Sequence, residues 1–410
     1  MTGRVIGGGA SGMAAAITAA RLGGRVTLLE MEDRVGKKLL VTGNGRCNLL
    51  NDGPLCYYHG RALALALCGG DGPKRVRAFF EGCGLRVMAA AEEDGRVYPA
   101  CGQAAAVLDA LRFTCEREGV ETVTGARAEH IRFSPGKGYT VSGAFGSRTG
   151  DRLIAACGSP AGKSSSPGAY GLLEALGHPV TGLSPALCPL ECDMRALKAL
   201  KGLRTPAVLT LLAGGRPVAQ AGGECLFQEQ GVSGICAMQL AADAWEVLGA
   251  GAALRVDFSP LMDLRDRAHF HRSAGEKLLP PDPAPVLRLL EERLSFLPRE
   301  RLLYGLLPRV LADAADRGRP SPEVLADRLT AFPLTVTGVR AAQAQVTRGG
   351  MDLNFFDPDT LESVRLPGLY CCGEMLDVDG DCGGFNLMFA FLSGIRAGES
   401  AAAPRKGDRP

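Results

Sequence analysis

The amino-acid sequence predicts an α/β fold in which one nucleotide-binding domain is assembled from both ends of the chain. Near the N-terminus, the glycine-rich stretch 7–12 joins a short apolar strand to an alanine-rich helix over residues 13–22. Near the other end, a buried strand ending at residues 373–374 leads through an acidic loop into an apolar helix over residues 387–397. Strand–turn–helix units of this kind build doubly wound, Rossmann-type sheets. The intervening segments have strand patterns and then helix patterns, so we expect inserted domains between the two halves.

The N-terminal turn has the G-x-G-x-x-G pattern, formed by Gly7, Gly9 and Gly12, with Ala10 and Ser11 between the last two glycines. The first glycine permits a tight turn, the second lets the backbone approach a pyrophosphate, and the third lets helix and strand pack closely. Free N–H groups and the positive dipole end of the helix would hold the phosphates. Glu30 ends the next strand, where its carboxylate can accept hydrogen bonds from ribose hydroxyls. The unit predicts binding of a dinucleotide that contains ADP.

A second stretch rich in glycine and asparagine, residues 36–48, follows closely on the strand that ends at Glu30. Its composition disfavours a regular helix or strand, and a surface turn is one interpretation. We favour a loop that contacts the cofactor, because the segments after the strands of a doubly wound sheet gather around the bound nucleotide.

The segments between these motifs have helix and strand patterns. Helices are expected over 74–84 and 103–118, with a hairpin over 85–97 between them. Further strands are expected at 120–123, 129–133, 139–142, 153–157 and 332–339. A small antiparallel domain is expected where the runs 185–189, 207–212 and 225–227 are separated by glycine-rich turns. Residues 234–248 and 260–328 have helical patterns.

Composition and charge favour a soluble, cytoplasmic protein that binds a small-molecule substrate. The chain of 410 residues has a formal net charge of +2, which gives no signal for a polyanion partner, so we expect no nucleic acid. No uncharged apolar run reaches the roughly 18–20 residues that a membrane span needs, so we expect no membrane partner. The 14 cysteines include no C-x-x-C pair, and reduced, mostly buried thiols are expected. The oligomeric state is left open.

Three patterns suggest other sites but lack what those sites require. Residues 158–164 resemble a phosphate-binding P-loop with one residue too few between the glycines. Asp377, Asp379 and Asp381 lack the glutamate that a calcium-binding EF-hand loop needs. His269 and His271 stand two apart, which on a helix points them away from each other. We therefore expect no metal site.

Several longer motifs resemble one protein family. They are the turn 7–13, the stretch 36–48, Arg-Val-Tyr-Pro at 96–99, Phe-Pro-Leu-Thr-Val-Thr-Gly at 332–338, Ala-Gln-Val-Thr at 344–347 and the segment 368–386. The last segment contains Gly-Glu-x-Leu-Asp-Val-Asp-Gly-Asp-Cys-Gly-Gly-x-Asn. On these motifs the chain resembles the BaiN/YhiN-like flavoproteins, which are bacterial NAD(P)/FAD-dependent oxidoreductases.

This resemblance implies a Rossmann-type FAD-binding domain over residues 1–181 and 351–400. Inserted into it would be a β-barrel-like domain over 182–258 and 331–350 and a helical domain over 259–330, with a disordered tail over 401–410. The pyrophosphate would lie at the N-terminal turn and the ribose at Glu30. The flavin and its ribityl chain would be contacted by Lys38, Arg46, Cys47, Asn48, Gly373, Glu374, Gly384, Phe385, Asn386 and Leu387.

The resemblance also implies an enzyme with FAD as the cofactor and NAD(P)H as the co-substrate. Because the sequence has no second G-x-G-x-x-G, the nicotinamide would dock against the flavin and not in a domain of its own. The expected reaction is reduction of a conjugated carbonyl compound, with a 3-oxo-Δ4 or Δ4,6 bile acid as the specific substrate. A flavin oxidase of small amines, such as aminoacetone, and a flavin-binding RNA-modification or regulatory protein are the alternatives. The general acid is unknown, and Tyr98 and Cys47 are candidates only because they lie in motif segments.

Overall fold

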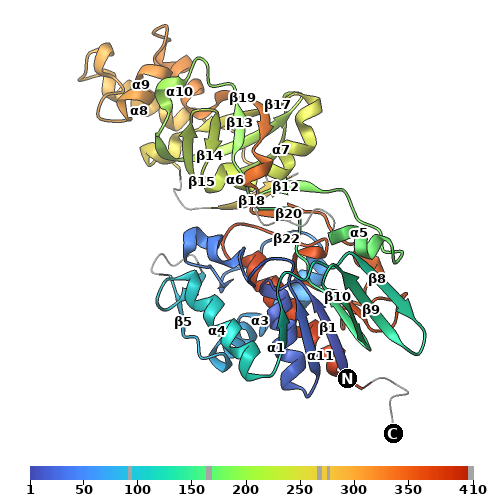
Figure 1. The fold of residues 1–410 in the computed structure, drawn as a ribbon. Coiled ribbons are helices and arrows are strands. Elements are labelled where there is room, and N and C mark those ends of the chain that lie inside the picture. The colour runs from blue at the N-terminus through green and yellow to red at the C-terminus, as the bar shows by residue number, and fades with distance from the viewer. Residues whose placement is uncertain (91–94, 163–168, 266–269, 275–277, 405–410) are drawn as a thin grey trace. The chain divides into compact units, whose positions relative to one another are not determined.

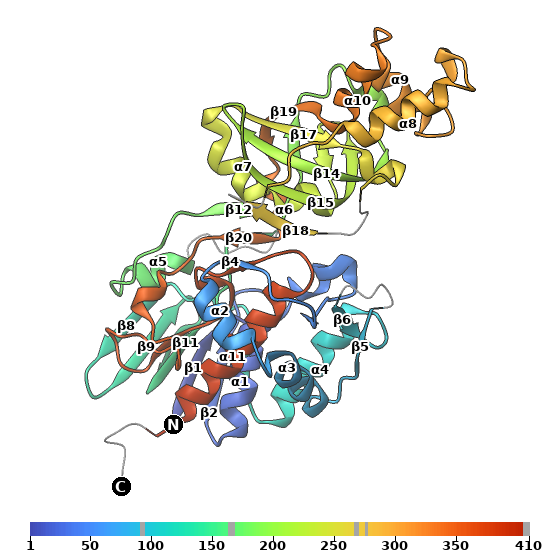
Figure 2. The same cartoon turned by 180° about the vertical axis from the view of Figure 1, so that it is seen from behind.

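The computed structural model describes residues 1–90, 95–162, 169–265, 270–274 and 278–404. The chain divides into two compact units, one made of Met1–Leu183 with Val346–Pro410 and the other of Ser184–Gln345. Both ends of the chain therefore belong to the same unit. Figure 1 and Figure 2 show this as blue and red elements that lie side by side.

A parallel sheet forms the centre of the first unit. Its strand order is β21-β11-β1-β2-β7, and every neighbouring pair is parallel. The described side chains of β11 and β21 are all buried, as expected for strands that helices or loops cover on both faces. The strands span Thr2–Ile6 (β1), Arg25–Leu29 (β2), Glu121–Val123 (β7), Arg152–Ala155 (β11) and Leu369–Cys371 (β21). The order places the N-terminal strand and a C-terminal strand on either side of β11.

Helices α1 (Ala10–Arg21) and α11 (Phe385–Ala402) pack closely against each other, as Figure 2 shows. The contact depends on glycines of α11. A Cβ atom at Gly394 would collide with the backbone of Ser11, and one at Gly398 would come within 2.5 Å of the Ala15 carbonyl. Small residues thus let the first and last helices of the unit approach to backbone contact.

The other elements of this unit surround the parallel sheet. Helices and turns span Leu39–Gly45 (η1), Arg61–Cys68 (α2), Gly72–Gly82 (α3), Ala104–Arg117 (α4), Ala169–Glu174 (α5), Leu353–Phe355 (η8) and Gly373–Met375 (η9). Short antiparallel sheets contain β3 (Leu50–Asn51), β4 (Tyr57–His59), β5 (Val87–Ala89), β6 (Arg96–Pro99), β8 (His130–Ser134), β9 (Gly138–Gly143), β10 (Gly146–Gly150) and β22 (Asp379–Gly380), and β20 spans Val346–Arg348. The predicted helix over 103–118 is α4, and the predicted hairpin is the antiparallel pair β5 and β6, with 91–94 outside the described residues.

In the second unit, six strands close into a barrel within the described residues. The order β14-β17-β19-β13-β16-β15 is closed by pairing of β15 with β14, and all these pairs are antiparallel. Strand β18 adds to the sheet beside β15. The strands span Ser184–Ala186 (β12), Leu190–Cys192 (β13), Arg204–Ala213 (β14), Arg216–Gln228 (β15), Gly231–Ser233 (β16), Ala252–Asp257 (β17), Phe270–Ala274 (β18) and Phe332–Val339 (β19). The unit therefore contains the β-barrel-like insert that the sequence predicted.

Helices and turns of the second unit follow β16 and precede β19. They are Ile235–Gln239 (α6), Ala241–Val247 (α7), Leu248–Ala250 (η3), Ser259–Met262 (η4), Ala284–Leu294 (α8), Arg299–Arg301 (η6), Arg309–Ala315 (α9) and Pro322–Thr330 (α10), while Lys198–Leu200 (η2) and Ala341–Gln343 (η7) lie outside this stretch.

Two sequence-based predictions were wrong, one about the range 260–328 and one about where the C-terminal tail begins. Strand β18 lies inside 260–328, which was expected to be helical, and it contains His271. His269 lies outside the described residues. The expected disordered tail began at 401, but α11 continues to Ala402 because its last turn remains buried through Ala401. Residues 405–410 lie outside the described residues.

Candidate functional site

The glycine-rich turn between β1 and α1 excludes side chains at two positions and leaves open space at a third. Gly7 has a φ of 104°, and a Cβ atom there would collide with the carbonyl of Ala156. A Cβ at Gly12 would collide with the carbonyl of Gly7. At Gly9, by contrast, no atom lies within 4 Å of the Cβ position. Gly7 and Gly12 are therefore required for packing, whereas the space beside Gly9 can admit a ligand close to the backbone.

The first turn of α1 presents N–H groups that have no acceptor within the helix. The hydrogen bond that opens the helix runs from Met13 N–H to the Gly9 carbonyl, at 3.0 Å. The N–H groups of Ala10, Ser11 and Gly12 come before it. They lie at the positive end of a helix of 12 residues. This end of the helix suits a pyrophosphate.

The carboxylate of Glu30 is held against the same turn. One oxygen accepts the Gly8 N–H at 2.7 Å, and the other accepts the Glu32 N–H at 2.9 Å. Glu30 is 9% exposed, so the side chain is fixed in a mostly buried position. A carboxylate has about four acceptor positions, and two remain for the hydroxyls of a ribose.

Lys38 and Glu374, which come from opposite ends of the sequence, form an ion pair. The Lys38 Nζ lies 2.6 Å from Glu374 Oε2, and Glu374 Oε1 accepts the Thr347 N–H at 3.3 Å. The Thr347 hydroxyl lies 3.1 Å from that of Ser159, which follows β11. The segments after β2, β11 and β21 therefore meet at the carboxyl edge of the sheet, where doubly wound folds bind nucleotides.

The stretch 36–48 is anchored on the glycine turn. It contains short 3₁₀ turns interrupted by non-helical backbone at Thr42, Gly43 and Asn44, so it forms no regular helix or strand, as its composition suggested. Gly36 N–H donates to the Gly8 carbonyl at 2.9 Å, and η1 follows. The Arg46 guanidinium lies over the Tyr98 ring, 4.1 Å from its centroid, in a cation–π contact. Arg46 and Tyr98, both singled out from the sequence, are thus neighbours.

Cys47 and Asn48, which follow Arg46 in the sequence, are buried. Cys47 has no exposed surface, and burial raises the pKa of its thiol to about 11, so it is a neutral thiol at pH 7. The Asn48 amide oxygen accepts the Val97 N–H at 3.3 Å. Both side chains therefore stabilise the loop, Cys47 by its burial and Asn48 by its hydrogen bond to Val97.

The N-terminus of α11 is shaped by Gly384, whose φ is 101°. A Cβ there would lie 2.6 Å from the Leu50 carbonyl and 2.7 Å from the Asn48 amide oxygen. The hydrogen bond that opens the helix runs from Met388 N–H to the Gly384 carbonyl, at 3.0 Å. The N–H groups of residues 385–387, which are Phe385, Asn386 and Leu387, precede it and have no helical acceptor.

The side chain of Asn386 closes the loop before α11. Its amide nitrogen donates to the Gly380 carbonyl at 2.7 Å, and its amide oxygen accepts the Gly380 N–H at 2.8 Å. The Phe385 carbonyl accepts a hydrogen bond from the Tyr57 hydroxyl at 2.8 Å. The side chain of Asn386 is therefore used to hold the loop, and its backbone N–H is the group that lies at the helix N-terminus.

The two helix N-termini point in the same direction and are offset along their axes. Gly394 of α11 faces Ser11, and Gly398 faces Ala15, so the helices run parallel. Because α11 begins at Phe385, its N-terminus extends about 12 Å beyond that of α1 at 1.5 Å per residue. One end suits a pyrophosphate and the other a second electronegative group. Together with Glu30, these residues fit a dinucleotide such as FAD.

The acidic loop 377–381 holds partners that the sequence did not indicate. Asp377 Oδ1 lies 3.1 Å from His59 Nδ1, and Asp379 Oδ2 lies 3.2 Å from Arg348 Nε in an almost fully buried ion pair. Asp381 is fully buried near Cys56. The antiparallel pairing of β4 with β22 places His59 beside this loop, whereas Arg348 comes from β20. Each carboxylate has a protein partner, which agrees with the expectation that the loop is not a calcium site.

Two further results concern sites that the sequence did not favour. Among the described residues, no group of three or more histidine, cysteine, aspartate or glutamate side chains could hold a metal ion. No helix in the described parts of the chain is long and apolar enough to cross a membrane.

The fold and this set of donors define a dinucleotide-binding protein of the Rossmann type. The chain matches the HI0933-like protein Rossmann domain family over residues 2–400. It therefore belongs to this family, which is the BaiN/YhiN type of flavoprotein that the sequence motifs indicated.

Curated relatives align with almost the whole chain. The 3-dehydro-bile acid delta(4,6)-reductase of Clostridium scindens is 36% identical, and the alignment covers 97% of this chain and 98% of that protein. The ribosomal RNA dihydrouridine synthases of Escherichia coli and Haemophilus influenzae are 27% and 25% identical, with 95% of each chain covered. A solved structure, 3-ketosteroid delta1-dehydrogenase from Sterolibacterium denitrificans, matches with a TM-score of 0.50 and 14% identity, covering 98% of this chain and 99% of that one. At that identity the likeness concerns the fold alone.

The predicted family and fold class are confirmed, and the chain is a flavoprotein oxidoreductase with FAD as its cofactor. The roles of individual cofactor residues and the use of NAD(P)H stay predictions. Because two relatives are named for ribosomal RNA, the expected absence of a nucleic-acid partner also stays a prediction.

Proposed function

We propose that this protein is an FAD-dependent reductase that uses NAD(P)H to saturate a carbon–carbon double bond conjugated to a carbonyl group. The observation that supports this most is the 36% identity, over 97% of the chain, to a bile acid delta(4,6)-reductase. The dihydrouridine synthase relatives support the same bond type, because the C5=C6 bond of uridine is conjugated to the C4 carbonyl.

The proposed reaction balances as the transfer of one hydride and one proton. The hydride goes from NAD(P)H to the β-carbon of the substrate, and the proton goes to the α-carbon, which gives a saturated carbonyl compound and NAD(P)⁺. FAD, when bound, supplies the relay that accepts the hydride from the nicotinamide and passes it on. The protein must therefore orient both reactants and stabilise the charge that develops during the transfer.

The groups of this chain fit that task at two places. The N-terminus of α1 would hold the pyrophosphate, and Glu30 the adenosine ribose. The N–H groups of residues 385–387 would stabilise negative charge on the part of the cofactor that faces α11. The Lys38–Glu374 ion pair lies between the segments that carry these groups and would contact the ribityl chain or the phosphates.

As part of this proposal, we assign His59 as the side chain that donates the proton to the α-carbon of the substrate. Its Nδ1 is held 3.1 Å from Asp377, and we propose that Nε2 is the nitrogen that carries the transferred proton. The hydrogen bond that His59 donates to the Asp377 carboxylate raises the pKa of His59 above its usual value, so more of it is protonated near neutral pH. Tyr98 and Cys47 suit the role less, because one lies under Arg46 and the other is fully buried.

The substrate class has two candidates. A 3-oxo-Δ4 or Δ4,6 bile acid follows from the relative with the higher identity. A uridine in ribosomal RNA follows from the dihydrouridine synthases, which are more distant at 25–27% identity. The net charge of +2 favours the small molecule, because RNA-binding surfaces are strongly basic. We also propose that the protein acts in the cytoplasm.

An anaerobic reoxidation experiment separates these candidates. The FAD-loaded protein is reduced with NADH or NADPH, and the flavin absorbance is followed after addition of a 3-oxo-Δ4 bile acid or a uridine-containing ribosomal RNA fragment. In a separate arm, the oxidised protein is mixed with aminoacetone in the absence of NAD(P)H and oxygen, and air is then admitted. We expect rapid reoxidation by the bile acid, with one saturated product formed per NAD(P)H consumed. Reoxidation by the RNA alone would select the second candidate. Anaerobic bleaching of the oxidised flavin by aminoacetone, followed by recovery of its absorbance in air, would select the oxidase alternative, because an amine oxidase takes electrons from the amine and passes them to oxygen.

A further inference from the structure

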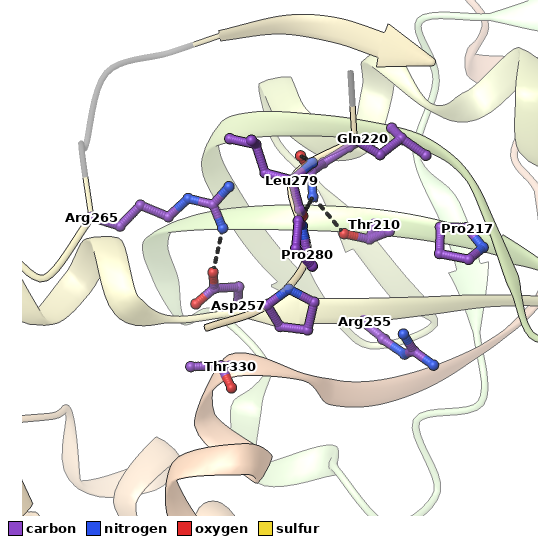
Figure 3. Close-up of a pocket in the computed structure, with 11 residues that line it drawn as sticks. Thr210, Pro217, Gln220, Arg255, Asp257, Arg265, Leu279, Pro280 and Thr330 are labelled. Carbon is purple, nitrogen blue, oxygen red and sulfur yellow. Dashed lines mark hydrogen bonds and ion pairs between the residues drawn. The ribbon is translucent and has the colours of Figure 1, made fainter. Parts of the chain in front are cut away.

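The outer wall of the barrel has a pocket of about 160 Å³ beneath the segment 278–281, as Figure 3 shows. Thr210, Gln220 and Arg255 line it from the neighbouring strands β14, β15 and β17. In the sheet register, Thr210 lies opposite Gln220 on one side and Arg255 on the other. The three polar side chains therefore form one row across the sheet.

One side-chain amide holds the segment above this row in place. The Gln220 amide nitrogen donates to the Leu279 carbonyl at 2.8 Å and to the Thr210 hydroxyl at 2.9 Å. The Gln220 amide oxygen accepts the Leu279 N–H at 3.2 Å. Gln220 thus pairs with Leu279 as another strand would, and it is 2% exposed. The walls are completed by the apolar side chains Pro217, Leu278, Leu279, Pro280 and Pro281.

The charges that line the pocket do not cancel. Asp257 is paired on both oxygens, since one lies 2.7 Å from the Arg265 guanidinium and the other accepts the Ser259 N–H at 2.8 Å. Arg255 is half-buried and has no ion-pair or hydrogen-bond partner in the part of the chain that the structure describes. With two arginines and one aspartate, the lining has a net charge of +1. A partly buried cation without a counter-ion is unfavourable, and an anionic ligand would relieve it.

The size of the pocket limits what this ligand can be. A dry cavity of about 150 Å³ can hold benzene, whereas drug-sized ligands need roughly 300 Å³ or more. A volume of about 160 Å³ therefore suits a body the size of one ring or one branched aliphatic group.

We infer that this pocket is a binding site for a small organic carboxylate, with Arg255 as its anion-binding residue. The planar guanidinium can take a carboxylate through two parallel hydrogen bonds. The Thr210 hydroxyl accepts from Gln220 and so retains its own hydrogen to donate to the ligand. The proline and leucine side chains would contact the apolar body. The lining lies wholly in the second unit, so this site does not depend on the proposed function.

Isothermal titration of the FAD-loaded, full-length protein with benzoate tests the site. We expect one saturable site, and we expect the neutral analogue benzamide to bind at least about tenfold more weakly. Arg255→Gln should weaken benzoate binding at least about tenfold, and Arg255→Lys should retain part of it. Arg216→Gln is the matched control, because it removes an equal charge from an exposed position of the same barrel and should leave binding unchanged.

Two readouts keep the test decisive. Because an aromatic acid could also bind near the flavin, the flavin absorption spectrum is recorded during the titration and should not change. If Arg255→Gln does not fold, Thr210→Val removes the second donor and should weaken benzoate binding severalfold. Binding that is equal in wild type, Arg255→Gln and Thr210→Val, or no saturable binding by the wild type, would overturn the inference.

Discussion

The Lys38 ammonium and the Glu374 carboxylate lie 2.6 Å apart although 336 positions separate them in the sequence. The side chains are 36% and 20% exposed, so the pair contributes little to folding, on the order of 0–1 kcal/mol. Its position at the carboxyl edge of the sheet predicts a larger role in binding the cofactor.

We therefore expect Glu374→Gln to weaken FAD binding by roughly 1.5–3 kcal/mol, the range for hydrogen bonds to a charged group. The midpoint of chemical unfolding of the FAD-free protein should change little. Titration of the FAD-free protein with FAD measures the affinity. Lys37→Met is the control, because Lys37 is the next residue to Lys38 and its ion pairs within the described residues are with Glu32 and Asp33. Equal losses in both variants would remove Glu374 from the site.

Glu30→Ala should affect both folding and cofactor binding. The carboxylate accepts the N–H groups of Gly8 and Glu32, so its removal leaves two donors without their acceptor. We expect a loss of about 1–3 kcal/mol in FAD affinity and a smaller loss in stability of the FAD-free protein. Glu32→Gln alters a neighbouring carboxylate that accepts no backbone N–H of the glycine turn, and it should leave affinity unchanged. Unchanged affinity in Glu30→Ala would show that Glu30 is not the ribose ligand.

Gly9→Val should impair FAD binding without lowering the stability of the FAD-free protein, whereas Gly394→Ala should lower that stability. The backbone at Gly9 is extended, and its Cβ position is open, so the FAD-free Gly9→Val protein should fold normally yet lose FAD. At Gly394 a methyl group would collide with the backbone of Ser11, which should cost about 1–3 kcal/mol in stability. Thermal unfolding with and without FAD distinguishes the two. A stable Gly9→Val protein that still binds one FAD per chain would contradict the assignment of Gly9 to the pyrophosphate site.

The His59–Asp377 contact should make stability depend on pH. The hydrogen bond that His59 donates to the Asp377 carboxylate raises the pKa of His59 in the folded protein. Asp379 acts in the same direction, whereas burial and Arg348 oppose it. A raised pKa means that the stabilising effect is complete below the unfolded value of about 6.5 and is lost as pH rises through the folded value. NMR titration of wild type and Asp377→Asn should show that the pKa of His59 falls in the variant. No change at His59 would exclude this contact in solution.

Alkylation should separate the cysteines by burial. Cys101 is the exposed one among the 14 thiols, all of which lie in the described residues, whereas Cys47 is fully buried. Burial raises the pKa of Cys47 to about 11, so little thiolate is present at pH 7. Iodoacetamide at neutral pH should modify Cys101 first and leave Cys47 unmodified, as read by mass spectrometry of the peptides. Early modification of Cys47 would restore it as a reactive residue.

Local sequence patterns were sufficient for the elements around the nucleotide. The turn at Gly7–Gly12 and the strand ending before Glu30 depend on neighbouring residues, and they formed as predicted. The range 260–328 was different, because β18 exists through pairing with β15, some 50 positions earlier, and no local pattern in Phe270–Ala274 indicates it.

Contacts between distant segments could not be predicted from one sequence. Gly394 is conspicuous only when Ser11 is known to face it, and Asn386 closes a loop by pairing with Gly380. The partners of the aspartates in 377–381 likewise come from distant segments, His59 from β4 and Arg348 from β20. The sequence could identify these residues as belonging to a motif, but not which of them hold the loop and which are free to meet a ligand.

The arrangement of the parallel sheet has a consequence for biosynthesis. Strand β21 and helix α11 complete the unit that β1 and α1 begin, and the whole of Ser184–Gln345 is translated between them. A nascent chain on the ribosome therefore holds an incomplete sheet, with β11 unpaired on one edge, until its final segment emerges. Cofactor loading must then be a post-translational event, and a chain whose synthesis stops early would be a target for proteolysis and not a partly active enzyme.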